Sequence, residues 1–407
     1  MSMKLNWMGR AALPLLLAVA GCAKGESFAP EAPGSSYDAV AGDYGESADG
    51  PSVPNGEGQG NPGATSGVLT AAEWNDLAHW DFWTKLLRNQ EWNQAFSMWR
   101  FNTTARVAVR VKDAGGNPAV NVPVALHRSQ NLVWEARTDN TGEANLWVDL
   151  FGEEGFEVPV NDLSVSISGQ VQAEAPGLCS PQGVSWNEYT VSASQCENKA
   201  DIAFIVDATG SMSDEIDFLK EDLLSILETV QQHQQGTEIR TGAVFYRDRG
   251  DDYITRSNPF TTNAVKTMSF VKKQEAEGGG DLPEAVHSAL ECGLQELEWN
   301  TAARARIAFL ILDAPAHYNE QGVLESLHKS ISLYAKSGIR MIPVLASTGD
   351  KSTEFMCRYF AMTTNGTYVF LTDDSGVGNS HLEPSVGEYQ VEKLNDLLVR
   401  LIEAYIK

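Results

Sequence analysis

Apolar residues in the C-terminal half of the chain gather in short, nearly continuous runs: Ile202–Val206, Ile307–Leu312, Ile339–Leu345 and Tyr368–Leu371. Such runs are typical of strands buried on both faces of a parallel sheet. Amphipathic stretches separate them. In the first, apolar residues recur at steps of three and four from Ile216 to Val230, which predicts a helix. Alternating strands and helices predict a doubly wound, Rossmann-like α/β domain over residues 200–407.

The pattern before this domain has a period of two. Valines alternate with mostly charged residues in Arg106–Lys112, and apolar residues alternate again from Val120 to Leu126. Turn-forming clusters follow at Asp113–Pro118 and Thr138–Gly142. Short alternating strands separated by turns indicate a small all-β sandwich over residues 102–175. Residues 176–199 are then expected to be a connector.

Residues 68–101 are unusually rich in tryptophan, with five of the ten tryptophans of the chain. The apolar residues here recur at roughly helical spacing, which predicts a short helical segment. The aromatic face could be an interaction surface, or it could pack on the next domain. A bare aromatic stripe would promote aggregation, so we expect it to be packed.

The first residues have the character of a targeting segment. Lys4 and Arg10 precede an apolar run, Ala11–Ala20. This run is too short to span a bilayer. This predicts a signal peptide over residues 1–21. Val19–Cys22 resembles the lipobox of bacterial lipoproteins, which implies cleavage before Cys22 and lipid attached to it. An ordinary signal peptide with a chance cysteine is the alternative.

Residues 22–67 are expected to be a tether, because they are rich in Gly, Ser, Pro and acidic residues and have few large apolar side chains. Lipid on Cys22 would place the protein in the cell envelope, and at the outer membrane in a Gram-negative host. The 407 residues include 30 Lys and Arg against 54 Asp and Glu, a formal charge of −24. Such a surface repels phosphate groups, which argues against nucleic acid as a partner. It also repels anionic lipid headgroups, so we expect contact with the membrane only through the lipid on Cys22.

The chain has five cysteines, and lipid on Cys22 would leave four of them for other roles. An even number outside the cytoplasm suggests disulfides. Cys179 and Cys196 would close a short loop within one segment and are the better-supported pair. Cys292 and Cys357 lie in two predicted helices, and either a bridge or two buried thiols is possible there.

Two of the buried strands end in an aspartate, Asp207 and Asp313. Open α/β sheets bind ligands at the carboxyl ends of their strands, where the strand order reverses. Two carboxylates that meet there repel each other, and a bound hard cation would remove the repulsion. Thr209 and Ser211 add hydroxyl groups at alternate positions of the same turn, and Gly210 permits its bend.

The sequence FIVDATGSM resembles the metal-ion-dependent adhesion site of von Willebrand factor type A domains, whose pattern is Asp-x-Ser/Thr-x-Ser. The resemblance implies Mg²⁺, or Mn²⁺ or Ca²⁺, held by Asp207, Thr209 and Ser211, with Asp313 closing the site. Asp281 stands where many members carry threonine. Its alternative role is a helix N-cap, with Glu284 three residues later as in a capping box. The sandwich resembles Ig-like modules related to carboxypeptidase regulatory domains.

Other polar residues follow the predicted strands and should form a partner-binding rim around the metal; these are Arg247, Asp251, His317, Asp373, Asp374 and His381. Arg249–Asp251 also spells the tripeptide that integrins read, although three residues often match by chance. Three aspartates would overcompensate a divalent ion. The sequence therefore favours metal binding more than adhesion to an acidic ligand.

The resemblance implies a non-catalytic, lipid-anchored module that binds a protein or surface ligand through its metal. The alternative is a metal-assisted phosphoester hydrolase, which would use the same site at the strand ends. However, the chain has no second aspartate two residues after Asp207, no nucleotide-binding Gly-x-x-x-x-Gly-Lys-Ser/Thr loop and no nucleophile elbow. A purely structural envelope protein is the third possibility.

Overall fold

The computed structural model describes residues 67, 69–152, 160–192, 196–280, 282–346, 349–375 and 381–407. The chain divides into a unit over Met1–Gly60 and a unit over Asn61–Lys407, and all described residues belong to the second. The expected signal peptide and Cys22 lie outside the described residues, as does the tether apart from Gly67. No helix in the described ranges combines the length and the apolarity needed to cross a bilayer.

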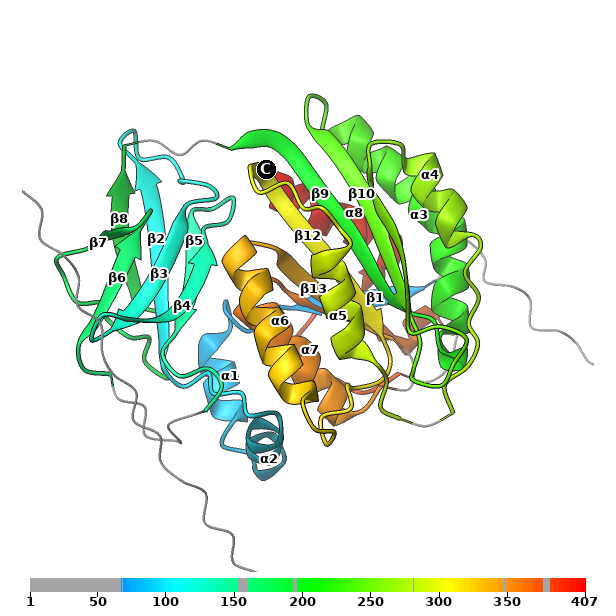
Figure 1. Cartoon of the computed structure of the whole chain (residues 1–407), viewed down its shortest axis with the longest axis horizontal. Helices are drawn as coiled ribbons and strands as arrows, with labels where there is room; N and C mark the ends of the chain where they lie inside the picture. Colours follow the sequence, from blue (N-terminus) through cyan, green and yellow to red (C-terminus); the bar gives the residue numbers. More distant parts are fainter. Residues whose placement is uncertain are drawn as a thin grey trace, which may run out of the picture. The chain divides into compact units, whose positions relative to one another are not determined.

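One eight-stranded sheet forms the centre of the α/β domain (Figure 1). Five parallel strands make up its middle: β10 (Glu238–Tyr246), β9 (Glu197–Asp207), β12 (Ala303–Leu312), β13 (Arg340–Leu345) and β14 (Tyr368–Thr372). Antiparallel strands flank them, with β11 (Thr255–Thr261) on β10, and β1 (Thr70–Trp74) followed by β15 (Glu392–Lys393) on β14. The doubly wound α/β fold is therefore confirmed.

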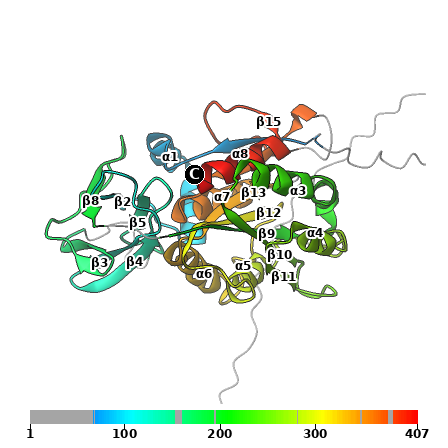
Figure 2. The same ribbon diagram turned by 90° about the horizontal axis from the view of Figure 1, so that it is seen from above.

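Helices cover both faces of this sheet (Figures 1 and 2). One face carries α3 (Ser213–His233), α4 (Ala264–Val271) and α8 (Leu394–Ile406), and the other carries α5 (Val286–Gln295), α6 (Val323–Ser337) and α7 (Lys351–Thr363). In β9, Phe204 and Val206 belong to the first core and Ala203 and Ile205 to the second. Burial on both sides explains why these strands read as continuous apolar runs.

The tryptophan-rich segment differs from the expectation in its first residues. It begins with strand β1, which lies between β14 and β15 in the large sheet, and continues with α1 (Trp80–Leu86) and α2 (Gln90–Trp99). The strand was missed because its sheet partners are about 300 residues away in sequence, beyond the reach of local spacing. The sandwich is consequently inserted into the α/β domain and does not simply precede it.

The packing expected for the tryptophans is confirmed. The side chains of Trp80, Trp83, Trp92 and Trp99 are all buried. Trp83 and Trp92 pack on Phe355 of α7, with ring centroids 6.0 and 5.7 Å apart. The segment is thus part of the core that joins the two folded regions and is not a free aromatic surface.

Two small sheets form the sandwich. One has the order β5 (Glu143–Trp147), β2 (Arg106–Asp113), β8 (Trp186–Val191), and the other β4 (Asn131–Arg137), β3 (Pro123–Arg128), β6 (Leu163–Ile167), β7 (Gln170–Val171). Strand β8 lies within residues 176–199, which were expected to be a connector, and pairs in parallel with β2. The connector is therefore shorter than predicted, and the sandwich extends to Val191.

The expected disulfide between Cys179 and Cys196 is wrong for this structure, in which Cys179, Cys196, Cys292 and Cys357 are all free. The reason is the strand between the first two. The N–H of Cys179 donates to the carbonyl of Arg106 at one end of β2, and β8 then runs along β2 until Val191 pairs with Asp113 at the other end. At about 3.3 Å per residue, this strand carries the chain some 20 Å away from Cys179 before Cys196 is reached.

Candidate functional site

The candidate site lies where the strand order of the large sheet reverses. From β9 the chain proceeds to β10 on one side, and then crosses to β12 and β13 on the other side. Val206 is paired with Ile311, so Asp207 and Asp313 follow neighbouring strands at the same edge of the sheet. The juxtaposition expected from the sequence is therefore present, and ligand-binding crevices of α/β sheets form at such points.

Asp207 is completely buried and only half satisfied by the protein. Its Oδ1 accepts hydrogen bonds from the N–H of Thr209 at 2.9 Å and from Thr209 Oγ1 at 2.7 Å. Its Oδ2 is buried and finds no hydrogen-bond partner in the ranges that the structure describes. Thr209 is also buried, whereas Ser211 is exposed in the short 3₁₀ helix Gly210–Met212 that precedes α3. The turn fixes the orientation of the carboxylate and leaves one oxygen for a further ligand.

A second loop, over residues 277–284, lies against this turn. The N–H of Gly210 donates to the carbonyl of Gly278 at 3.2 Å, and the N–H of Glu277 donates to the carbonyl of Ala208 at 3.1 Å. Gly278 has a φ of +80°, and a Cβ there would overlap the carboxyl group of Asp251. Glycine is therefore required at this position by both backbone conformation and space. Asp281, the expected metal ligand of this loop, lies outside the described residues.

Glu284 is a site residue that the sequence analysis interpreted differently. Helix α5 has Ala285 as its N-cap, so a capping box formed by Asp281 and Glu284 is wrong. Glu284 is only 3% exposed, and its Oε2 is buried without a hydrogen-bond partner. A Cβ on Gly279 would contact both Glu284 Oε1 and the Thr209 side chain at 3.2 Å, which places Glu284 beside the first loop.

Burial and mutual repulsion raise the pKa values of Asp207 and Glu284. Burial, with the nearby Asp313, raises the pKa of Asp207 to about 7. Burial, with Asp207 next in importance, raises the pKa of Glu284 to about 9. Burial and the charge on Asp207 also raise the pKa of Tyr246, which pairs with Asp207 across the sheet. Charged carboxylates are stable in such a place only with a compensating cation.

The metal-free protein should therefore lose stability as the pH rises. The folded state keeps protons that an unfolded chain releases near pH 3.8 at Asp207 and near pH 4.5 at Glu284. Because the folded state then binds more protons, the free energy of unfolding falls with pH, until about pH 7 for Asp207 and about pH 9 for Glu284. Melting temperatures measured in a chelator between pH 5 and 9 test this; a flat or rising profile contradicts it.

The rim predicted from the sequence is only partly available to a partner. Arg247 is 5% exposed and donates to the carbonyl of Glu275 at 2.9 Å, while His317 is buried with its Nε2 2.7 Å from Asp248 Oδ1. Asp251 Oδ2 accepts the N–H of Gly279 at 3.0 Å, so it braces the second loop. These three residues are internal supports, which corrects the expectation of an exposed rim.

Of the remaining rim residues, Asp373 and Asp374 lie at the surface, whereas the side chain of His381 is only 4% exposed. Asp373 and Asp374 are exposed in the 3₁₀ helix after β14, and His381 Nδ1 lies 2.7 Å from Asp373 Oδ1. In the integrin-type tripeptide, Arg249 pairs with Glu320 and contacts His287, and Asp251 is bound to the second loop. The tripeptide is therefore engaged within the protein.

The oxygen atoms of this site are suitable ligands for a hard cation, but they are not all carboxylates. Among the described residues, no group of three or more His, Cys, Asp or Glu side chains is placed to hold a metal ion. The candidate set instead combines two aspartates with the hydroxyl groups of Thr209 and Ser211. Carboxylate and neutral oxygen atoms are the ligands that Mg²⁺ takes. The unpartnered Oδ2 of Asp207 is the atom that such an ion would satisfy.

Comparison with known proteins identifies the class of domain. Residues 201–376 match the family model of the von Willebrand factor A domain, which supports a domain of this kind in that part of the chain. Such a domain is consistent with a protein-interaction or adhesion module. The match covers the turn after β9, the second loop and Asp313, and it ends just after β14.

Individual relatives share this region only in part. The alpha-protein kinase vwkA of Dictyostelium discoideum is 25% identical over 224 residues, which is 53% of this chain and 34% of that protein. A putative ariadne-like RING finger protein, R811, of Acanthamoeba polyphaga mimivirus is 33% identical over 118 residues, 29% of this chain and 11% of that protein. The pilus adhesin SpaC of Lactobacillus rhamnosus GG has a TM-score of 0.38 at 12% identity, covering 53% of this chain and 32% of the adhesin.

Proposed function

We propose that this protein is a non-catalytic binding module of the bacterial cell envelope, anchored by lipid on Cys22, whose von Willebrand factor A domain binds a protein or surface ligand through a bound divalent cation. The proposal is carried by one observation. At the strand ends, the carboxylate oxygen Asp207 Oδ2 is buried and has no hydrogen-bond partner among the described residues. The anchoring and envelope location are supported by the lipobox-like sequence before Cys22.

Asp207, Thr209, Ser211 and Asp313 would hold the ion, which we propose to be Mg²⁺, with Mn²⁺ or Ca²⁺ as substitutes. Thr209 orients Asp207 through two hydrogen bonds to Oδ1. The other oxygen, Oδ2, is then left for the ion. Glu284 would accept a hydrogen bond from water bound to the ion, because it is buried beside Thr209. When bound, the cation would supply positive charge for a ligand oxygen.

The charge balance favours partners that do not rely on a carboxylate. Asp207 and Asp313 alone would already neutralise a divalent ion, and the exposed Asp373 and Asp374 add negative charge at the same edge of the sheet. A partner carboxylate would therefore meet repulsion, whereas hydroxyl, carbonyl or basic groups would not. We propose a neutral or basic surface as the ligand.

Metal titration followed by ligand capture tests this function. Calorimetry with Mg²⁺ and Mn²⁺ should detect one site in the wild type and none in Asp207→Ala. Envelope proteins or cell-surface material retained by the immobilised wild type in Mg²⁺ should be lost on chelation and in Asp207→Ala. Equal retention in all three conditions would favour a purely structural protein. Metal-dependent phosphoester hydrolysis that Asp207→Ala abolishes would favour an enzyme.

A further inference from the structure

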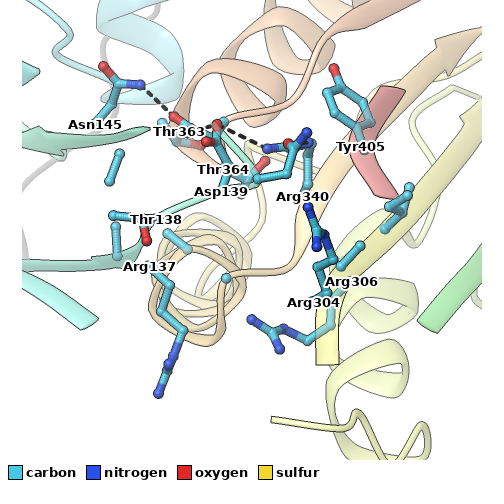
Figure 3. A pocket seen from close by; sticks show the side chains of 18 residues that line it. Arg137, Thr138, Asp139, Asn145, Arg304, Arg306, Arg340, Thr363, Thr364 and Tyr405 are labelled. Carbon is cyan, nitrogen blue, oxygen red and sulfur yellow. Dashed lines mark hydrogen bonds and ion pairs between the residues drawn. The ribbon is translucent and has the colours of Figure 1, made fainter. Parts of the chain in front are cut away.

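Four arginines line a small cavity at the opposite edge of the sheet, where the sandwich contacts the α/β domain (Figure 3). Arg304 and Arg306 come from β12, Arg340 is the first residue of β13, and Arg137 is the last residue of β4. The volume of this arginine cavity is about 30 Å³. Because one water molecule needs roughly 10–15 Å³, the space suits a water molecule or one small ion, and excludes an organic ligand.

The positive charges of the arginine cavity are only half balanced. Arg340 pairs with Asp139 at 3.0 Å, and Arg304 donates to a backbone oxygen of Lys407. Arg137 donates to the carbonyl and side-chain oxygens of Asn121 at 2.7 and 3.0 Å. Asp139 is the one carboxylate among the described residues that line the cavity.

Arg306 likewise bonds only to neutral oxygens. Its Nη1 donates to three backbone carbonyls, and its Nη2 donates to Asn121 Oδ1 at 2.6 Å. Asp201 lies opposite Arg306 on β9, but it already accepts two hydrogen bonds from Arg240 at 2.7 Å each. Among the described residues, the guanidinium groups of Arg137 and Arg306 therefore have no carboxylate partner.

Unused donors lie in the same place. Arg306 and Arg340 are 4% and 7% exposed. Within the described part of the chain, the Nε of each is buried without a hydrogen-bond partner, as is the Nε of Arg304. A buried N–H without a partner is destabilising, so three such groups on residues lining one cavity call for an acceptor. Burial, with the neighbouring Arg137 next in importance, also lowers the pKa of Arg306 to about 10.

We infer that the arginine cavity binds one small inorganic anion, of the size of chloride, which accepts from the free Nε–H groups and fixes the inserted sandwich on the α/β domain. The anion would offset the repulsion between Arg137 and Arg306 across the junction. It would bind at the edge of the sheet opposite Asp207, so it is independent of the proposed cation.

Bromide provides a direct test, because it replaces chloride and scatters anomalously. Crystals of the full chain grown in bromide should show an anomalous peak within hydrogen-bond distance of Arg306 or Arg340 Nε. The melting temperature should rise with chloride relative to gluconate at equal ionic strength. At about 100 times Kd, one site shifts the folding equilibrium by about 100-fold.

Two variants make the test specific. Arg137→Gln, at a half-buried position, should keep the fold and weaken the chloride effect at least severalfold, because one unbalanced charge is removed. Arg400→Gln, which removes an exposed arginine elsewhere, should leave the effect unchanged. An empty cavity in the bromide crystals, or melting temperatures equal in chloride and gluconate, overturns the inference. A chloride effect of the same size in Arg137→Gln overturns it as well.

Discussion

The Asp207→Asn protein should be more stable than the wild type without metal above about pH 7, and should not respond to Mg²⁺. Asparagine keeps an oxygen for the two hydrogen bonds from Thr209, and it removes a buried charge beside Asp313. Saturating metal should stabilise the wild type by about 2.7 kcal/mol at about 100 times Kd, and the variant by nothing. Thermal unfolding at pH 8, with Mg²⁺ and with chelator, measures both effects.

Glu228→Gln is the matched control, since it neutralises an exposed acid on α3 away from the crevice. Its metal response should equal that of the wild type. If Asp207→Asn retained the full response to Mg²⁺, the metal would bind elsewhere. If the variant were less stable than the wild type in chelator at pH 8, the repulsion between Asp207 and Asp313 would be unimportant.

Replacement of Arg358 by methionine should cost about 3–5 kcal/mol of unfolding free energy, because it leaves the buried Asp76 without its cationic partner. Arg358 is completely buried on α7 and donates to both oxygens of Asp76, at 2.8 and 2.6 Å, and to Glu354 at 3.1 Å. Its guanidinium also lies 5.2 and 4.8 Å from the ring centres of Trp83 and Trp92. This network binds the tryptophan-rich segment to the α/β domain.

Urea unfolding followed by tryptophan fluorescence measures the loss. Arg400→Met removes an arginine with two carboxylate partners in a half-exposed setting, and should cost less than about 1 kcal/mol. Similar losses in the two variants would show that the buried network contributes no more than surface ion pairs.

Much of the large sheet could be predicted from the sequence, because burial on both faces imposes continuous apolar runs on strands such as β9 and β12. The position of Asp207 and Asp313 followed from the same pattern, since each directly follows such a run. Strands β1 and β8 could not be found in this way. Their partners, β14 and β2, are distant in sequence, and their own residues alternate too briefly to give a signal.

The details of the site could not be predicted, because the spacing of residues in the sequence does not determine where their side chains lie in three dimensions. Glu284 fits the spacing of a capping box as well as it fits a buried site residue, and only the start of α5 at Val286 separates the two. The loop between Cys179 and Cys196 looks short in sequence, but the direction of β8 separates its ends. Arg247 and His317 follow the strands that lead to the site, as expected. Both side chains are buried, however, so they support the loops and do not face a partner.

The pairing of β1 also fixes the edge of the sheet at which this strand begins. Thr70 is opposite Thr372, the last residue of β14, so the polypeptide enters at the same edge of the sheet as Asp207 and Asp313. A tag or anchor placed directly before β1 would therefore lie at the same end of the domain as the candidate site.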